Sequence, residues 1–324
     1  MKSFYPEQYN SLSKMMKLKK RKSLTFGLAV PVLNEVKTLK KTIDVIKSCG
    51  DLIDQVIIMD SGSSDGSVEL CKKHGFAVIN DTDTAENLGI KLLRGKGWNL
   101  WSSLFYVDTD LVAWIDSDLK NINKKFLLGI IGPMLSDDKI QFVKGYWCRR
   151  NDGGRVTEIM VRPFINLVFP ELRDFIQPLS GEYGGRTEFL RKLNFYSGYS
   201  VEIAILLQAR MILGDDEIAQ SFLGNRFHSH QSPLSLGKMS SNILHTMLHL
   251  ARGLERISYE DDILSKSLVG YYSKNGKDIC TESSHISDEV LPSVNKLRNK
   301  KVNVIQLANG HRNRRIYAKN EGFN

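Results

Sequence analysis

Between residues 24 and 118 the sequence alternates short apolar runs with segments of helical periodicity, and few folds are compatible with that order. The apolar runs lie at residues 24–33, 55–60, 76–80 and 112–115. Strands separated by helices pair in parallel through right-handed crossovers, and such sheets bind ligands at the carboxyl ends of their strands. We therefore predict an α/β fold with a mostly parallel sheet flanked by helices.

Polar and acidic side chains follow three of these runs: Asn34 and Glu35, Asp60 and Ser61, and Asp116 and Asp118. Side chains two apart on an extended chain point the same way, so Asp116 and Asp118 would repel each other unless a cation lies between them. Carboxylates suit Mg²⁺ or Mn²⁺, which bridge protein oxygens to substrate phosphates. An Asp-x-Asp pair is also compatible with an ordinary strand end. In this context it favours a metal that holds a nucleotide diphosphate.

Two glycine-rich segments are candidate anion sites. Lys96 stands between two glycines just before a helical stretch, where backbone amides and an ammonium suit an anion. The segment is not a Walker loop, and a plain turn with an exposed lysine is the alternative. Gly153 and Gly154 precede Arg155 and Thr157, a pattern that suits phosphate or carboxylate. The alternative there is a hairpin turn at residues 149–154, between strands at 140–147 and 156–161.

Arg226, His228 and His230 alternate, so an extended segment would present all three on one side, as a phosphate or metal site or as structural residues. His245 and His249 are four apart on an apparent helix that lacks the glutamate of metalloproteases. We expect these two to be ordinary helix-surface or interface residues.

Four further polar residues, Glu182, Tyr183, Tyr199 and Glu202, lie in or beside apolar segments. The carboxylates of Glu182 and Glu202 suit sugar hydroxyls. An acid in the first turn of a helix equally complements the helix dipole.

Composition narrows the function only slightly. The 324 residues carry a formal net charge of +9, which suits nucleic acid, a membrane surface or an anionic small substrate. The four cysteines form no Cys-x-x-Cys pair, which argues against a zinc knuckle or a disulfide framework. No signal-peptide core or membrane span is evident, so we expect a cytoplasmic protein. Basic residues 17–22 and the tail 296–319, with eight Lys or Arg and no acid, are expected to be solvated.

The sequence resembles the glucosyl-3-phosphoglycerate synthases, retaining glycosyltransferases of the GT-A fold, which is Rossmann-like. The resemblance runs from Ala29 to Lys238 and rests on motifs in the family's order: PVLNE, DSGSSDGS, GKG, DSD, GGRVTE, RP, QPLSGEYGGR, GYSVEI and RFHSHQ. It implies transfer of glucose from a nucleoside-diphosphate glucose, typically UDP-glucose, to the 2-hydroxyl of 3-phosphoglycerate, giving a precursor of glucosylglycerate, a compatible solute. It implies Mg²⁺, or Mn²⁺ or Co²⁺, as cofactor.

The resemblance also assigns roles to single residues. Donor contacts fall to Pro31, Leu33, Glu35, Ser61, Lys96, Asp116, Ser117, Asp118, Leu179, Tyr199 and Glu202; acceptor contacts to Gly154, Arg155, Thr157 and His230; metal ligands to Asp116, Asp118 and His228. Lys96, Glu202 and Arg226 are the candidate catalytic residues. The resemblance further implies attack on the same face of the sugar as the leaving diphosphate, which takes the acceptor's proton.

We expect a basic leader (1–22), a GT-A domain binding donor and acceptor (23–235) and a mainly helical C-terminal region for homodimerisation (236–324). The nearest alternative is another GT-A transferase, such as a mannosyl-3-phosphoglycerate synthase or a polysaccharide transferase. Arg155 in its Gly-Gly loop favours a small phosphorylated acceptor. A distant alternative, suggested by the charge and the basic tail, is a non-catalytic nucleic-acid binder, but the sequence lacks the stacking aromatics or recognition helix of such modules. We expect neither nucleic acid nor membrane as a partner.

Overall fold

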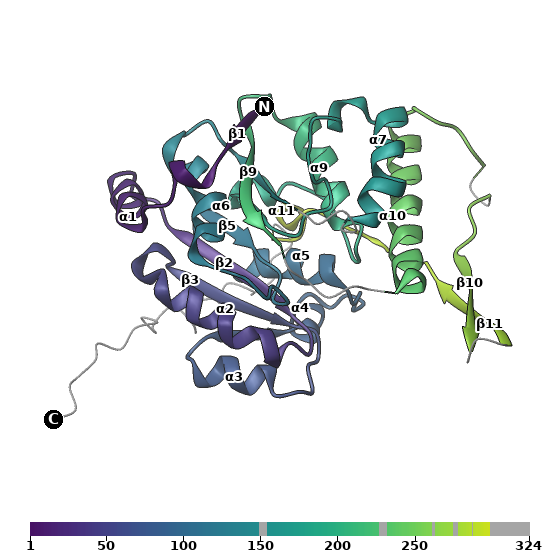
Figure 1. Cartoon of the computed structure of the whole chain (residues 1–324), viewed down its shortest axis with the longest axis horizontal. Helices are drawn as coiled ribbons and strands as arrows, with labels where there is room; N and C mark the ends of the chain where they lie inside the picture. Colours follow the sequence, from purple (N-terminus) through teal and green to yellow (C-terminus); the bar gives the residue numbers. More distant parts are fainter. Residues whose placement is uncertain (149–153, 227–231, 261–262, 275–277, 287, 299–324) are drawn as a thin grey trace.

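The centre of the molecule is an eight-stranded sheet with the strand order β1-β9-β6-β7-β5-β2-β3-β4 (Figure 1). The computed structural model describes residues 1–148, 154–226, 232–260, 263–274, 278–286 and 288–298. The strands are β1 (Lys2–Phe4), β2 (Phe26–Val32), β3 (Gln55–Asp60), β4 (Ala77–Asn80), β5 (Leu111–Trp114), β6 (Phe142–Cys148), β7 (Tyr183–Arg186) and β9 (Ile218–Asn225). All neighbouring pairs are parallel except those of β7, which is antiparallel to β5 and β6. The predicted α/β fold with a mostly parallel sheet is confirmed.

Helices cover both faces of this sheet. The hydrophobic cluster on one face includes residues of α1 (Leu12–Arg21), α2 (Val36–Ser48), α3 (Ser67–Lys73) and α6 (Lys124–Ser136). The cluster on the other face includes residues of α4 (Asp81–Leu88), α5 (Lys96–Tyr106), α7 (Arg162–Val168), α8 (Thr187–Leu190), α9 (Val201–Ile212), α10 (Pro233–Gly253) and α11 (Val294–Arg298).

The strand sequences account for this two-sided core. In β5 and the residue after it, Leu111, Ala113 and Ile115 belong to one cluster, whereas Val112 and Trp114 belong to the other. Successive side chains of a strand point to opposite faces, so a strand covered on both sides is apolar throughout. Such a continuous run is what the sequence shows before Asp116. The strand is therefore anchored on both faces directly before the Asp-Ser-Asp segment.

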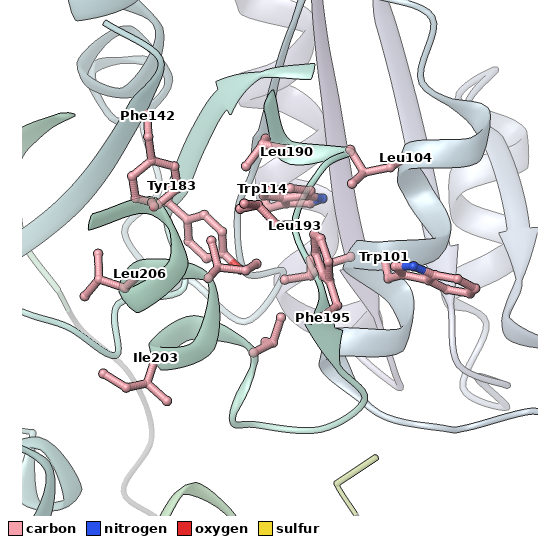
Figure 2. Packing of buried hydrophobic residues seen from close by; sticks show 14 of the residues in the cluster. Trp101, Leu104, Trp114, Phe142, Tyr183, Leu190, Leu193, Phe195, Ile203 and Leu206 are labelled. Atoms are coloured by element: carbon pink, nitrogen blue, oxygen red, sulfur yellow. The ribbon is translucent and has the colours of Figure 1, made fainter. Parts of the chain in front are cut away.

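Large aromatic side chains fill the core on the α5 and α9 side (Figure 2). The rings of Trp114 and Tyr183 lie 5.2 Å apart between centroids, and those of Phe142 and Tyr183 lie 5.9 Å apart. Trp114 Nε1 donates a hydrogen bond to Ser103 Oγ, so the indole buries no unpaired donor. This packing joins the central strands β5, β6 and β7 to α5, which begins at Lys96.

Two sequence predictions about element type are wrong. Residues 156–161 form no strand: Thr157–Val161 is a π-helical segment that runs directly into α7. Val156, Thr157, Val161 and Ile165 are buried while Ile159 is 75% exposed, which is a helical spacing that the β-branched residues concealed. A hairpin turn between two strands is thereby excluded, although residues 149–153 lie outside the described part of the chain.

The N-terminal residues are also more than a solvated leader. Lys2–Phe4 pair in parallel with β9 as an edge strand, and Met15 of α1 is fully buried against the core. Lys19 within the basic run 17–22 donates to Asp54 Oδ2 at 2.6 Å and to two backbone carbonyls. The basic tail beyond Arg298 lies outside the described residues.

The C-terminal region is less helical than predicted. After α10 an antiparallel hairpin of β10 (Ser267–Lys274) and β11 (Asp278–His285) projects from the body (Figure 1). A further short strand, β12 (Val290–Leu291), pairs with β8 (Phe195–Tyr196) and precedes α11. Across the described ranges, no helix combines the length and the apolar character needed to cross a membrane.

Candidate active site

A cavity of about 670 Å³ opens at the carboxyl ends of β2, β3 and β5. Fifteen residues singled out in the sequence line it: Pro31, Leu33, Glu35, Ser61, Lys96, Asp116, Ser117, Asp118, Gly154, Arg155, Thr157, Leu179, Tyr199, Glu202 and Arg226. His228 and His230 lie outside the described residues. Asp60, the remaining strand-end acid, does not line the cavity: it accepts hydrogen bonds from the amides of Gly62 and Ser63 and closes the turn after β3.

Asp116 is held by two cations. Lys96 Nζ lies 2.7 Å from Asp116 Oδ1, and Arg226 donates through Nη2 to Oδ2 at 3.0 Å. Burial raises the pKa of the Asp116 carboxyl, but the two cations outweigh that effect and hold the pKa well below its usual range. Asp116 is therefore a permanent anion at neutral pH. In this structure the positive charge predicted beside it is supplied by the protein itself.

Asp118 has a different environment from Asp116. Within the described part of the chain its Oδ1 is buried and accepts no hydrogen bond, and it pairs with Arg226 Nη2 at 3.7 Å. Burial and then the neighbouring Asp116 charge raise the pKa of the Asp118 carboxyl to about 6. A buried carboxylate oxygen without a partner is costly. It is suited to receive a further cation.

Arg226 lines the cavity and also contacts Glu182, which the sequence analysis considered as a contact for sugar hydroxyls. Glu182, directly before β7, is fully buried and is not part of the cavity wall. Arg226 Nη1 donates to both oxygens of Glu182, at 3.0 and 3.1 Å, and Trp147 Nε1 donates to Glu182 Oε2 at 2.7 Å. Glu182 thus cannot grip a sugar, as the sequence suggested, because its carboxylate is fully used in orienting the guanidinium. Tyr183 is likewise buried in the core.

Lys96 begins α5, and its ammonium is shared by two acids. Besides Asp116 it lies 2.8 Å from Glu202 Oε1. Burial lowers the pKa of Lys96, but Asp116 and Glu202 outweigh it and hold the pKa well above the ordinary value of 10.5. A lysine ammonium carries three N–H donors, so these two pairs leave it one further hydrogen-bonding direction. That direction is relevant to a ligand in the cavity.

The glycines on either side of Lys96 allow the start of α5 to pack closely against residues 196–198. A Cβ on Gly95 would lie 2.6 Å from Ser197 O, and one on Gly97 only 1.7 Å from Tyr196 O. The amides of Gly97 and Trp98 donate to the carbonyls of Gly198 and Ser197. These amides are therefore not available to an anion. The carbonyls of residues 197 and 198 accept from them, and Gly95 and Lys96 of this motif line the cavity.

Gly181 makes room for the central ion pair. A Cβ there would lie 2.4 Å from Asp116 Oδ2 and 2.5 Å from Lys96 Nζ. Any larger residue would separate the two charges. The glycine of the QPLSGEYGGR motif is therefore required by the close approach of Lys96 and Asp116.

Behind the cavity lies a second buried lysine. Lys144 of β6 donates to Ser180 O at 2.7 Å, and its Nζ lies 4.4 Å from the centroid of the Tyr183 ring. Burial lowers the pKa of Lys144 to about 7, with Glu202 acting in the opposite direction. Lys144 does not line the cavity. Through its bond to Ser180 O, Lys144 holds the backbone of the segment 177–182 behind the cavity.

Several cavity residues have no counterpart in the sequence analysis. They are Leu236, Met239, Asn242 and Ile243 of α10, Arg94 and Asn99 near α5, and Asp288 near the C-terminal end of the described chain. The α10 residues follow a helical spacing that is equally typical of a core face, so no local signal distinguishes them. His245 and His249 pack edge to face, with ring centroids 4.4 Å apart on the same helix, and do not line the cavity.

Residues 28–183 match the model of glycosyl transferase family 2. A glucosyl-3-phosphoglycerate synthase from Petrotoga mobilis is 36% identical over 289 residues, which cover 85% of this chain and 88% of that protein.

Solved structures agree with this. A glucosyl-3-phosphoglycerate synthase from Mycobacterium tuberculosis in complex with Mn²⁺, UDP-glucose and phosphoglyceric acid has a TM-score of 0.77 and 32% identity, covering 89% of this chain and 95% of that one. A mannosyl-3-phosphoglycerate synthase from Rubrobacter xylanophilus has a TM-score of 0.84 and 27% identity, covering 91% and 97%. The predicted GT-A-type fold and the family resemblance are both confirmed.

Proposed function

This chain belongs to the glucosyl-3-phosphoglycerate synthases, and we propose on that basis that it transfers glucose from UDP-glucose to 3-phosphoglycerate with a divalent metal ion. The same proposal includes three finer assignments. They are retention of configuration, the acceptor's 2-hydroxyl as the attacking group, and the role of each residue.

One observation supports the proposal most strongly: all the candidate donor residues, and the candidate acceptor residues that the structure describes, line a single cavity. Pro31, Glu35 and Ser61 line the end formed by β2 and β3, whereas Arg155 and Thr157 line the cavity from the segment that follows β6. Gly154 has φ +74°, a conformation that favours glycine, and it turns the backbone there. Arg155 offers the fork that suits a phosphorylated acceptor. A two-substrate transfer needs this shared space.

The residues present fit a divalent metal. Asp118 Oδ1 is a buried carboxylate oxygen without a hydrogen-bond partner among the described residues, and hard oxygen ligands suit Mg²⁺ and Mn²⁺. No cluster of three acidic, histidine or cysteine ligands occurs within the described ranges, and the third ligand that we propose, His228, lies outside them. We infer that Asp116, Asp118 and His228 hold the ion. When bound, it would stabilise the negative charge on the departing diphosphate.

The protein's own cations provide the rest of the electrostatic stabilisation. In the transfer, the bond between the sugar C1 and the diphosphate oxygen breaks, and its electron pair leaves with the diphosphate. A bond forms between C1 and the acceptor's 2-hydroxyl oxygen on the same face, and the hydroxyl proton passes to the departing diphosphate. Lys96 is fixed by Asp116 and Glu202 with one N–H direction left, which suits it to meet that charge without reorganising.

Arg226 acts in the same place from the opposite side. Its guanidinium is fixed by Glu182 and bonded to Asp116, so it keeps the Asp-Ser-Asp segment in one arrangement. We propose that it contributes positive charge near the leaving group and that Glu202 and Tyr199 border the glucose. Both line the cavity beside Lys96.

The assay that tests the function combines the purified chain with UDP-glucose, Mg²⁺ or Mn²⁺ and 3-phosphoglycerate. We expect UDP release that depends on both the metal and the acceptor, and an α-linked product by NMR. GDP-mannose in place of UDP-glucose tests the mannosyl alternative, because a solved relative is a mannosyl enzyme. Faster transfer from GDP-mannose would replace the proposed donor. Absence of nucleotide release with every donor would contradict the function.

We also propose that the enzyme is a homodimer that uses the β10–β11 hairpin. Val269 and Tyr271 lie on one face of β10 and are 51% and 70% exposed, whereas Gly270 between them faces Leu234 of α10. An apolar strand face exposed on a projecting hairpin suits a second copy of the chain. Light scattering should give twice the monomer mass for the wild type and the monomer mass for the double variant Val269→Lys and Tyr271→Lys. A monomeric wild type at micromolar concentration would rule this out.

A further inference from the structure

A C-terminal segment, residues 288–294, contributes Asp288 to the cavity wall although it lies far from the site motifs in sequence. Its strand β12 pairs with β8, and the backbone of Glu289 exchanges hydrogen bonds with Ser197. Trp101 Nε1 donates to Pro292 O at 2.7 Å. The segment is thus tied both to the loop 197–200 and to α5.

Asp288 makes the contact closest to the site. Its Oδ2 accepts from the amide of Ser200 at 3.0 Å and from Ser200 Oγ at 2.5 Å. Its Oδ1 occupies the space beside Gly198, since a Cβ on that glycine would lie 1.9 Å away. Asp288 and Gly198 both line the cavity, and Ser200 is fully buried. Burial raises the pKa of the Asp288 carboxyl, and the bonds from Ser200 act in the opposite direction.

Ser200 stands between the two residues proposed to border the glucose. Tyr199 precedes it, and Glu202 lies in the first turn of α9, which begins at Val201. On its other side the loop receives the amides of Gly97 and Trp98 at the start of α5, next to Lys96. A shift of the loop 197–200 would therefore displace Tyr199 together with Glu202, the carboxylate that pairs with Lys96.

We propose that Asp288 is a positioning residue for the sugar end of the donor: through Ser200 it holds Tyr199 and Glu202 in place around the hexose. The inference rests on the proposed function, because it assumes a sugar nucleotide in the cavity. It assigns no role in holding the nucleotide, since the candidate donor residues Pro31, Glu35 and Ser61 line the end of the cavity formed by β2 and β3. The alternative is that Asp288 only caps α9 and stabilises the fold.

The ratio of two affinities separates these roles. In Asp288→Ala, the Kd for UDP-glucose should rise about 10-fold, as expected for losing a hydrogen bond to a charged group, while the Kd for UDP stays within about twofold. Both are measured by calorimetry with Mg²⁺ present. The KM for 3-phosphoglycerate should not move. Asp288→Asn should fall between wild type and Asp288→Ala, since its amide oxygen still accepts from Ser200.

Glu289→Gln is the matched control. Glu289 is the next residue, its carboxylate pairs with exposed Lys91, and its backbone alone contacts Ser197. Removing this charge should leave both affinities unchanged. Ser200→Ala should give part of the Asp288→Ala effect, and the double variant no more than Asp288→Ala alone, because the two side chains act through one contact.

Every outcome of the comparison is informative. Equal loss of UDP and UDP-glucose affinity in Asp288→Ala would show that the residue only stabilises the fold, and wild-type values for both would show that it has no role. If Asp288→Ala does not fold, Asp288→Asn and Ser200→Ala give the same comparison. A wild type that binds UDP-glucose but transfers nothing to 3-phosphoglycerate would contradict the proposed function and leave this inference standing.

Discussion

Replacing Asp118 by Asn is expected to lower kcat/KM for glucose transfer about 1,000-fold or more. The side chain keeps its size, so the cavity wall is preserved, but the carboxylate charge that suits a divalent ion is lost. Asp118 Oδ1 has no hydrogen-bond partner within the described part of the chain, so the substitution removes no hydrogen bond to that oxygen there, only its 3.7 Å pairing with Arg226. The measurement is UDP release over a range of Mn²⁺ concentrations, together with the affinity for UDP with and without metal.

Asp110→Asn provides the control at the other end of the same strand. Asp110 precedes β5 and accepts hydrogen bonds from the amide and hydroxyl of Thr25, away from the cavity. We expect its kcat/KM to stay within about twofold, as is usual for a surface substitution. Retention of a tenth or more of wild-type activity in Asp118→Asn, or equal losses in the two variants, would remove Asp118 from the metal site.

The part of the fold that was predictable is the part set by local pattern. Continuous apolar runs such as Val112–Ile115 predicted buried strands, and parallel pairing then predicted that Glu35, Ser61 and Asp116 would meet at one edge. The structure does bring these residues to one cavity. The segment 156–161 was misleading, because β-branched residues favour strands locally while its burial follows a helix.

What the sequence did not predict depends on contacts between distant segments. Glu182 appeared as a free carboxylate, and only its bonds to Arg226 and Trp147 show that it orients another side chain. The amides after Lys96 suited an anion until residues 197 and 198 were seen to accept from them. Asp288 lies beyond the recognisable motifs, and nothing in its immediate sequence marks it. Such roles arise from pairing over long sequence separations, which periodicity does not report.

Among the described residues, the two cations at the centre of the site are already paired with carboxylates before a substrate arrives. Lys96 lies between Asp116 and Glu202, and Arg226 between Asp116 and Glu182. Charges fixed in this way stabilise a departing diphosphate without reorganisation. The same arrangement makes the site sensitive to losing any one member, because a buried charge is then left without its partner.

Lys96→Met should show both effects. The donor diphosphate loses its ammonium, which we expect to lower kcat about 100- to 1,000-fold, as for removal of one preorganised donor. Asp116 and Glu202 lose their shared cation at the same time, which should lower the free energy of unfolding by about 3 kcal/mol. Urea unfolding and steady-state kinetics on one preparation measure the two quantities.

Lys144→Met is the matched variant, since it removes a second lysine that is buried behind the cavity and does not line it. Lys144 is bonded to Ser180 O and not to a carboxylate, and burial lowers its pKa to about 7, so the group is only partly charged at neutral pH. A methionine of similar volume should leave the free energy of unfolding within about 1.5 kcal/mol of wild type. Activity should fall less than about fivefold, because Lys144 does not line the cavity and its loss leaves Lys96 and Arg226 in place. Equal loss of activity in the two methionine variants would mean that Lys96 acts through the packing behind the cavity and not on the diphosphate.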